Sequence, residues 1–183
     1  MDHQLPIVET GADQGHQAAD KVQPLALRWA DESATQVFAR TLAQQPQLDN
    51  AFITLHGDLG AGKTTLARHL LQALGVTGRI KSPTYTIVET YETDRFTVSH
   101  FDFYRFNDPQ EWEDAGFRDI FASPGLKLAE WPQKAAGLLP VADLDIHLET
   151  DTDGARKVTL IAHTPLGKEL LQGVTSSNES AQP

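Results

Sequence analysis

Residues 51–74 read AFITLHGDLGAGKTTLARHLLQAL, and residues 57–64 within this stretch match the complete pattern G-x-x-x-x-G-K-[ST]. The apolar run 52–55 precedes the match as a buried strand would, and leucines at helical spacing follow it until Gly75. The stretch therefore predicts a strand, a phosphate-binding loop and a helix in that order.

The residue types of this loop suit a nucleotide and its metal ion. Glycines let the backbone wrap closely around a phosphate, so that successive N–H groups and the helix N-terminus face the anion. Lys63 can reach the outer phosphates, and the Thr64 hydroxyl can bind the Mg²⁺ that accompanies them. The guanine-reading string Asn-Lys-x-Asp is absent, which favours ATP. The predicted nucleotide-binding residues of the loop are Asp58, Leu59, Gly60, Ala61, Gly62, Lys63, Thr64 and Thr65.

Composition limits the class of protein. The 183 residues, 40% of them hydrophobic, are enough for one domain with a full core. With a formal net charge of -10, the chain lacks the basic surface typical of a protein that binds nucleic acid. No binding to DNA is therefore predicted, and any RNA would be held by a partner. The absence of cysteine excludes disulfides, thiolate metal sites and a cysteine nucleophile. The seven histidines show no pair at metal-ligand spacing with a carboxylate motif, so no zinc site is predicted.

The chain has no apolar run long enough to cross a bilayer, and its first residues lack the basic and apolar regions of a secretory signal. A cytoplasmic location without a membrane partner is therefore expected. Residues 1–23 are interpreted as a disordered polar leader, residues 24–172 as a P-loop ATPase domain, and residues 173–183 as a disordered tail.

Patterns outside the loop predict a mixed sheet. Alternating segments rich in β-branched and aromatic residues indicate two antiparallel hairpins, and Ser33 with Gln36 has the spacing of a capping box for the first helix. The predicted fold is a compact α/β P-loop NTPase fold, in which a parallel nucleotide-binding core carries antiparallel hairpins and helices cover both faces. Strands are expected at 25–29, 52–55, 85–91, 96–103, 126–131, 144–148 and 157–162, and the later helices at 109–114, 133–139 and 166–171.

Hydrolysis needs a carboxylate at the magnesium and a group that positions water. Asp102 and Glu130 each end an apolar run, and ligands of such sheets lie beyond the carboxyl ends of the parallel strands. The alternatives are an ion pair of Asp102 with Arg105 and an ordinary charge at a strand end for Glu130. Trp131, next to Glu130, is either a contact at the site or a core residue.

The segment 82–84, Ser-Pro-Thr, lies between the helix of the loop and the next strand. Other NTPases place at this point a segment that senses the γ-phosphate through a hydroxyl group. Ser82 and Thr84 are therefore predicted to form a switch, and a plain turn is the alternative.

Four strings in this order and spacing, HGDLGAGKTTLARHLLQALG, KSPTYTIVETY, HFDFYRF and LAEWPQ, resemble the TsaE (YjeE) family of small bacterial ATPases over about residues 31–171. The resemblance implies a role in making threonylcarbamoyladenosine, the modified base beside the anticodon of tRNAs that read codons beginning with A. It also implies work with the TsaD and TsaB proteins, which would contact the tRNA.

The resemblance further implies roles for single residues. Thr64 and Glu130 look like magnesium ligands, and Asp102, with Lys63, looks catalytic. Ser82 and Thr84 look like the first switch, and Trp131 would lie near the site. Glu32 and Arg156 are similar in placement to family positions near the nucleotide.

Three functions agree with these residues. The first is an accessory ATPase that is slow alone and stimulated by partners. The second is a small-molecule kinase of the same fold, although no clustered basic segment offers the usual lid over the phosphates. The third is a nucleotide-dependent binding module in which hydrolysis is incidental.

Overall fold

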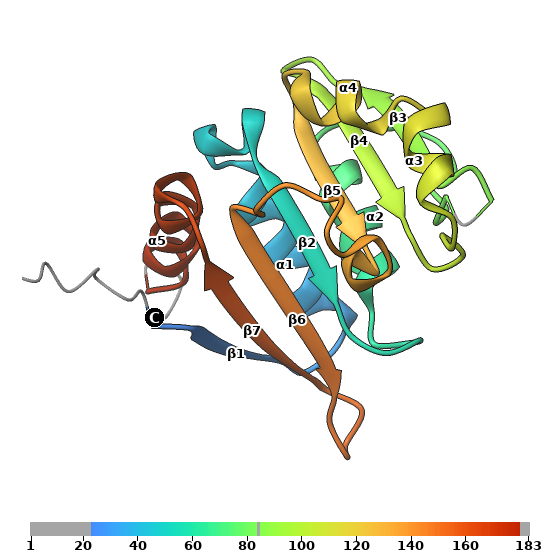
Figure 1. The fold of residues 1–183 in the computed structure, drawn as a ribbon. Helices are drawn as coiled ribbons and strands as arrows, with labels where there is room; N and C mark the ends of the chain where they lie inside the picture. The colour runs from blue at the N-terminus through green and yellow to red at the C-terminus, as the bar shows by residue number, and fades with distance from the viewer. Residues whose placement is uncertain (1–22, 84, 180–183) are drawn as a thin grey trace, which may run out of the picture.

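A seven-stranded sheet forms the centre of the protein, with strand order β1-β7-β6-β2-β5-β4-β3 (Figure 1). The computed structural model describes residues 23–83 and 85–179. The strands are β1 (Leu25–Trp29), β2 (Phe52–His56), β3 (Val88–Glu92), β4 (Thr97–Asp102), β5 (Leu126–Glu130), β6 (Leu144–Thr150) and β7 (Arg156–Ala162).

The middle of the sheet is parallel and its margins are antiparallel. Strand β2 pairs in parallel with β5 and β6, and β4 pairs in parallel with β5. The pairs β1–β7, β6–β7 and β3–β4 are antiparallel. Strand β5 is buried along its whole length, as expected for a parallel strand covered on both faces. The predicted mixed sheet with a parallel core is confirmed.

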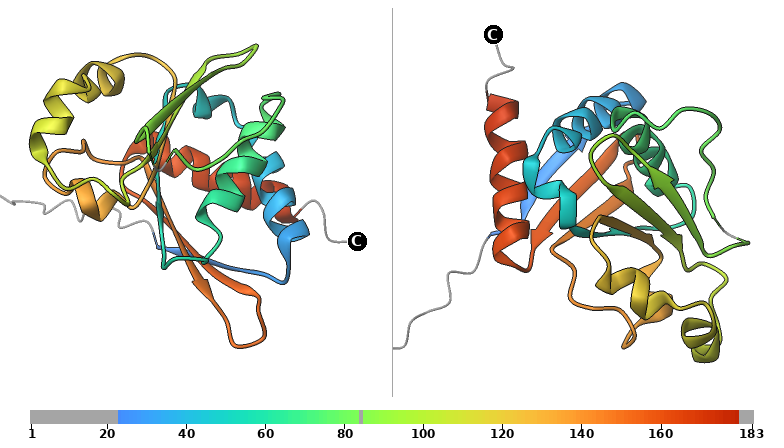
Figure 2. Two further views of the ribbon diagram at one scale, coloured as in Figure 1. Left: turned by 90° about the vertical axis from the view of Figure 1, so that its right-hand side faces the viewer. Right: turned by 90° about the horizontal axis from the view of Figure 1, so that it is seen from above.

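Helices cover both faces of this sheet (Figure 2). Three helices share one core with the strands, and two shorter helices pack on the opposite face over β4 and β5. The first group is α1 (Glu32–Ala43), α2 (Lys63–Ala73) and α5 (Pro165–Glu179); the second is α3 (Pro109–Asp114) and α4 (Phe117–Ala122).

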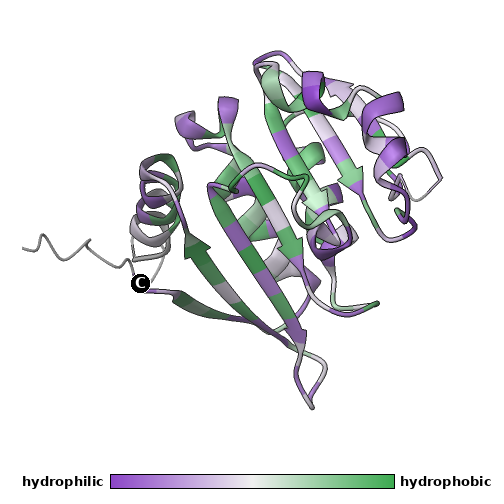
Figure 3. Ribbon diagram, viewed as in Figure 1, coloured by the Kyte–Doolittle hydropathy of each residue, from purple (hydrophilic) through white to green (hydrophobic). Residues whose placement is uncertain are grey.

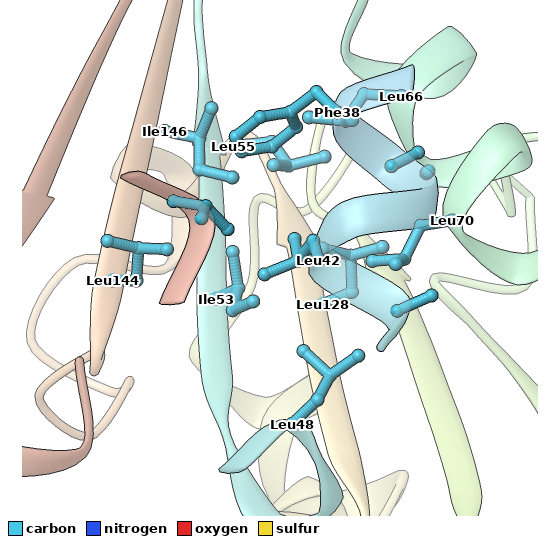
Figure 4. Close-up of a cluster of buried hydrophobic side chains, with 14 of the residues drawn as sticks. Phe38, Leu42, Leu48, Ile53, Leu55, Leu66, Leu70, Leu128, Leu144 and Ile146 are labelled. Atoms are coloured by element: carbon cyan, nitrogen blue, oxygen red, sulfur yellow. The ribbon is translucent and has the colours of Figure 1, made fainter. Parts of the chain in front are cut away.

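The two cores differ in composition. The core under α1 and α2 is aliphatic, and Figure 4 shows Leu42 and Leu70 from these helices facing Ile53 and Leu128 from the strands. The core under α3 and α4 is aromatic, built around Phe101. Figure 3 shows the corresponding hydrophobic colour along the central strands. The aliphatic core thus supports one face of β2 up to Leu55, next to the point where the loop begins.

The bounds of several elements differ from those predicted from local sequence patterns. The N-cap of α1 is Asp31, whose side chain accepts a 3.1 Å bond from the backbone N–H of Ala34, so the capping box predicted from Ser33 and Gln36 is wrong. The Ser33 hydroxyl instead donates to Asp31. Residues 132–135 form a 3-10 helix (Pro132–Ala135) in place of the longer helix predicted at 133–139.

Strand β3 is shorter than predicted because Ile87 has φ of 63°, in the left-handed region, and pairing begins only at Val88. The backbone N–H of Ile87 donates to the carbonyl of Pro83, and the Ile87 carbonyl accepts from the N–H of Asp102. Residues around Ile87 therefore form a turn that is fastened to the end of β4. Trp131 also has a left-handed φ of 57°, and it ends β5 at Glu130.

The C-terminal helix is longer than the sequence predicted. Helix α5 continues to Glu179, and Val174 is buried in the aliphatic core with 2% exposure. The tail predicted to be disordered from residue 173 is therefore helical through residue 179. The predicted leader covers residues 1–23, and all of it except position 23 lies outside the described residues. No helix in the described part of the chain has the length and apolarity needed to span a bilayer.

Helix α1 provides a matched test of the core. Leu42 is wholly buried, whereas Val37 on the same helix is 56% exposed. Leu42→Ala should lower the free energy of unfolding by about 2–5 kcal/mol because it leaves a cavity, and Val37→Ala should change it by less than about 0.5 kcal/mol. Urea unfolding followed by circular dichroism measures both. Equal losses in the two variants would contradict the placement of this helix.

Candidate nucleotide site

The phosphate-binding loop connects the carboxyl end of β2 to the first turn of α2. Gly57 has φ of 138°, and a Cβ atom there would lie 2.3 Å from the backbone oxygen of Leu148 on β6. Gly62, just before α2, has φ of 109°. Residues with a side chain rarely adopt these φ values, and at Gly57 a side chain would also overlap the neighbouring strand. The course of the loop therefore depends on glycine at both positions.

Lys63 points back into the loop and is almost wholly buried, with 4% of its surface exposed. Its ammonium group donates to the carbonyl oxygens of Gly57 (2.6 Å) and Asp58 (2.8 Å) and lies 4.1 Å from the ring centroid of Trp131. Burial lowers the pKa of Lys63, and nearby carboxylates oppose that shift. The cation is held at the centre of the loop by two carbonyl dipoles and an aromatic face.

Thr64, Glu130 and His100 form a chain of polar side chains beneath the loop. The Thr64 hydroxyl donates to Oε2 of Glu130 at 2.8 Å, and Oε1 of Glu130 lies 2.9 Å from Nε2 of His100. His100 is wholly buried and Glu130 is 1% exposed. Because each carboxylate oxygen has its own partner, the Glu130 carboxylate is fixed in one orientation beside the hydroxyl.

Asp102 ends β4 and is the register partner of Glu130 on β5, so the two carboxylates stand side by side on neighbouring strands. The Ser82 hydroxyl donates to Oδ2 of Asp102, and the backbone N–H of Tyr104 donates to Oδ1 at 2.9 Å. Ser82 is thus brought to the predicted acid. Thr84, the other predicted switch residue, lies outside the described residues.

A cavity of about 240 Å³ gathers these groups beside the loop. It contains the predicted magnesium ligands, the predicted catalytic residues and one predicted switch residue. Its lining is Leu59, Gly60, Gly62, Lys63, Thr64, Thr65, Ser82, Asp102, Tyr104, Glu130 and Trp131.

A second cavity, of about 110 Å³, lies on the other side of the loop and brings together Glu32 and Arg156. The Glu32 carboxylate accepts from Arg68 at 3.1 Å and lies 2.9 Å from Nε2 of His69; these hydrogen bonds lower the pKa of Glu32. Nε of Arg156 donates to the Ala61 carbonyl at 2.7 Å. The two residues predicted near the nucleotide therefore share one pocket with the loop. The pocket is completed by Trp29, Asp31, Thr35, Ala61, Gly62, Thr65, Leu148 and Gly154.

The structure bears on two of the alternatives, the contact of Arg105 and the position of Trp131. The guanidinium of Arg105 lies over the ring of Tyr85, 4.7 Å from its centroid, while Asp102 accepts from Ser82 and the Tyr104 N–H. Trp131 is partly exposed and packs on the aromatic core as well as on Lys63. It is both a core residue and a contact at the site.

Sequence reasoning missed His100 and Tyr104. His100 lies two residues before Asp102 on β4, so strand alternation places both side chains on one face, and this signal was available. The ring of Tyr104 lies 5.0 Å from that of Trp131, centroid to centroid, a contact between distant segments that no local pattern reveals.

Comparison with known proteins identifies the family. The family described as Threonylcarbamoyl adenosine biosynthesis protein TsaE matches residues 29–158. The chain belongs to the TsaE family. A relative from Haemophilus influenzae, called tRNA threonylcarbamoyladenosine biosynthesis protein TsaE, is 43% identical over 139 residues, which cover 76% of this chain and 87% of the relative. A relative from Bacillus subtilis with the same name is 38% identical over 110 residues, which cover 60% of this chain and 68% of the relative.

A solved structure agrees with the TsaE assignment. The crystal structure of Bacillus subtilis YdiB superposes with a TM-score of 0.70 at 27% identity and covers 85% of this chain and 97% of that chain. The predicted family and the predicted P-loop fold are confirmed.

The close approach of Gly57 to β6 can be tested against Gly60, a loop glycine with φ of 82° whose added Cβ would meet nothing within 4 Å. Gly60→Ala should cost about 1–2 kcal/mol from its backbone conformation alone. Gly57→Ala should cost at least about twice as much, because it also forces the loop away from Leu148. Urea unfolding compares the two variants. Equal costs would show that β6 does not constrain the loop.

Proposed function

We propose that this protein is a magnesium-dependent ATPase that serves the synthesis of threonylcarbamoyladenosine on tRNA. The observation that carries the proposal is the convergence of a phosphate-binding loop with Thr64, Glu130 and Asp102 in one cavity. The names of the relatives from Haemophilus influenzae and Bacillus subtilis supply the pathway.

The loop and Lys63 would hold the phosphates. Backbone N–H groups at the start of α2 and its helix dipole favour an anion at this point. The Lys63 ammonium already lies in the loop, where phosphate oxygens would replace the carbonyls of Gly57 and Asp58 as its acceptors. Little of its rotamer freedom remains to be lost on binding.

Thr64 and Glu130 would hold the magnesium ion. Mg²⁺ prefers oxygen ligands and keeps several waters, so one hydroxyl and one carboxylate fit it well. When bound, the ion would neutralise charge on the phosphates. His100 would keep Oε2 of Glu130 directed at Thr64 through its contact with Oε1.

Asp102 would orient the attacking water and accept its proton. It stands beside Glu130 on the neighbouring strand, and its Oδ1 and Oδ2 are held by the Tyr104 N–H and by Ser82. A carboxylate fixed in this way presents its remaining lone pairs in a defined direction. Ser82 and Thr84 would form the switch that senses the γ-phosphate, and Ser82 would couple it to Asp102 through its hydrogen bond.

The pocket of Glu32 and Arg156 would receive the adenosine part of ATP. It adjoins the phosphate cavity through Gly62 and Thr65, which line both. Arg156, at the start of β7, donates a hydrogen bond to the Ala61 carbonyl of the loop. A nucleoside bound in this pocket would therefore contact both the loop and the β6–β7 hairpin.

The partners would be the TsaD–TsaB complex, with tRNA contacted through that complex. Lys63 is the single cation among the described residues that line the phosphate cavity, so this part of the chain supplies no arginine for the transition-state charge. Hydrolysis by the protein alone should therefore be slow, because such an arginine raises turnover greatly in related enzymes. The net charge of -10 also favours indirect contact with tRNA.

Substituting the predicted acid separates hydrolysis from binding. Asp102→Asn keeps the acceptor for the Tyr104 N–H but removes the base, so ATP hydrolysis should fall about 10²–10⁴-fold while the Kd for ATP changes little. Lys63→Ala should instead weaken ATP binding. Steady-state phosphate release and calorimetry measure the two quantities. Asp114→Asn on the exposed side of α3 is the matched control, and full activity of Asp102→Asn would remove Asp102 from the mechanism.

The partner requirement is tested by the rate of ATP hydrolysis with and without TsaD–TsaB and tRNA. The rate should be low for the protein alone and should rise about tenfold or more with the complex present, since groups supplied in trans would complete the site. Asp102→Asn in the same mixture should show no rise. A rate that the complex leaves unchanged, with ATP still bound, would contradict partner activation.

A further inference from the structure

The sheet face opposite α1 and α2 carries a cluster of polar side chains on β2, on the first half of β6 and just after β7. His56 and Thr54 come from β2, Asp145 and His147 from β6, and His163 follows β7. The aromatic core under α3 and α4 covers β4 and β5 (Figure 1), and the cluster lies beside it, half-buried and open to solvent. This face is opposite to the one on which Thr64 meets Glu130.

The register of the sheet creates the cluster. His56 and His147 are direct partners in the parallel pair of β2 and β6, and their rings stack at 4.3 Å with an interplanar angle of 12°. Asp145 lies two residues before His147, so strand alternation puts its carboxylate on the same face. Nε2 of His56 is 3.7 Å and Nε2 of His147 is 4.0 Å from the nearer carboxylate oxygens of Asp145.

We propose that His56, Asp145 and His147 bind a divalent transition-metal ion of the zinc class. One ligand atom from each residue lies within 4.8 Å of the others. Ligands of a tetrahedral zinc site at about 2.0–2.1 Å from the ion stand roughly 3.4 Å apart, so the two imidazoles would rotate out of their stacked arrangement to close the set. Two imidazoles and one carboxylate match the ligand types of catalytic zinc sites, which leave a fourth position for water.

The carboxylate is already oriented by residues that would not touch the ion. Thr54 donates to Oδ1 of Asp145 at 2.5 Å, and Nε2 of His163 lies 2.7 Å from Oδ2. Burial raises the pKa of Asp145, but the hydrogen bonds from His56, Thr54 and His163 outweigh it and hold the pKa below its ordinary value. Metal-binding carboxylates are commonly supported in this way.

Binding would change the tautomer of His56. Nε2 of His56 lies 2.9 Å from the Thr54 hydroxyl, which itself donates to Asp145, so this geometry fits a ring with its proton on Nε2. An ion needs the lone pair of this nitrogen, so the ring would bind it as the other tautomer, with the proton on Nδ1. The hydrogen bond between His56 and Thr54 would break, and coordinate bonds from the three ligand atoms to the ion would form.

A bound ion would stabilise the point at which the phosphate-binding loop leaves β2. His56 is the residue before Gly57, and His147 lines a hollow together with Gly57 and Asp58. An ion that joins β2 to β6 at this point would fix the strand pair from which the loop departs. Because the ion lies on the opposite face, its binding does not need the proposed ATPase activity.

The experiment is a zinc titration of the full, untagged chain in competition with a chromophoric chelator, without nucleotide and with excess Mg²⁺ to occupy oxygen-ligand sites. The protein should bind one Zn²⁺, and Co²⁺ in its place should show the visible absorption of a tetrahedral complex. His56→Asn with His147→Asn should weaken zinc binding by more than about 100-fold, and Thr54→Val by about 10–100-fold. His16→Asn, outside the described residues, is the matched histidine control and should bind as the parent does.

Thermal unfolding without metal shows whether each variant is folded. The proposal is overturned if the parent chain binds no zinc in competition with the chelator, if the folded double variant binds it as tightly as the parent, or if only His16→Asn loses it. The His56, Asp145 and His147 cluster would then be a network of ion pairs. None of these outcomes depends on ATP hydrolysis, so failure here and failure of the proposed function are distinguishable.

Discussion

The parallel pairing of β2 with both β5 and β6 is the constraint on which the rest of the structure depends. It aligns the carboxyl ends of three strands at one edge of the sheet. Glu130 reaches Thr64 only because β5 ends beside the start of the loop, and Gly57 meets Leu148 only because β6 runs on the other side. The same alignment sets His56 against His147. Both proposed ion sites are therefore products of one register.

Burial of charge around this edge is costly unless each group is partnered. Lys63 and Asp102 are each 4% exposed and Glu130 is 1% exposed, yet every one of them is hydrogen-bonded. Buried carboxylates on neighbouring strands also repel each other, and a cation placed between them and the phosphates would relieve that repulsion. The repulsion between these buried carboxylates therefore lies where a charged ligand would offset it, as expected for a functional site.

The sequence predicted what local patterns control. The loop, its strand and its helix lie in one continuous segment, so spacing alone identifies them, and the end of an apolar strand was enough to point to Asp102 and Glu130. The pocket of Glu32 and Arg156 was reached only through resemblance, because its members lie on α1 and β7. The His56–His147 pair depends on register between strands that are far apart in the chain, which no single-sequence pattern specifies.

Errors at element ends have equally physical causes. Asp31 and Ser33 are both good N-caps, and the helix begins after the first of them because Asp31 reaches the Ala34 N–H. Helix α5 passes Gly173 because Val174 gains burial in the aliphatic core, which outweighs the low helix propensity of glycine. Tertiary packing decided the boundary where local propensity was ambiguous.

The left-handed Ile87 has a consequence for how the site responds to its ligand. A β-branched residue in this conformation costs roughly 1–2 kcal/mol, and the turn persists because it is tied to Pro83 and Asp102. Asp102 is thereby attached twice, to Ser82 through the serine hydroxyl and to Ile87 through its own backbone N–H. A displacement of Ser82 would act on the Asp102 carboxylate through a single hydrogen bond, whereas the backbone bond to Ile87 would keep the end of β4 in place.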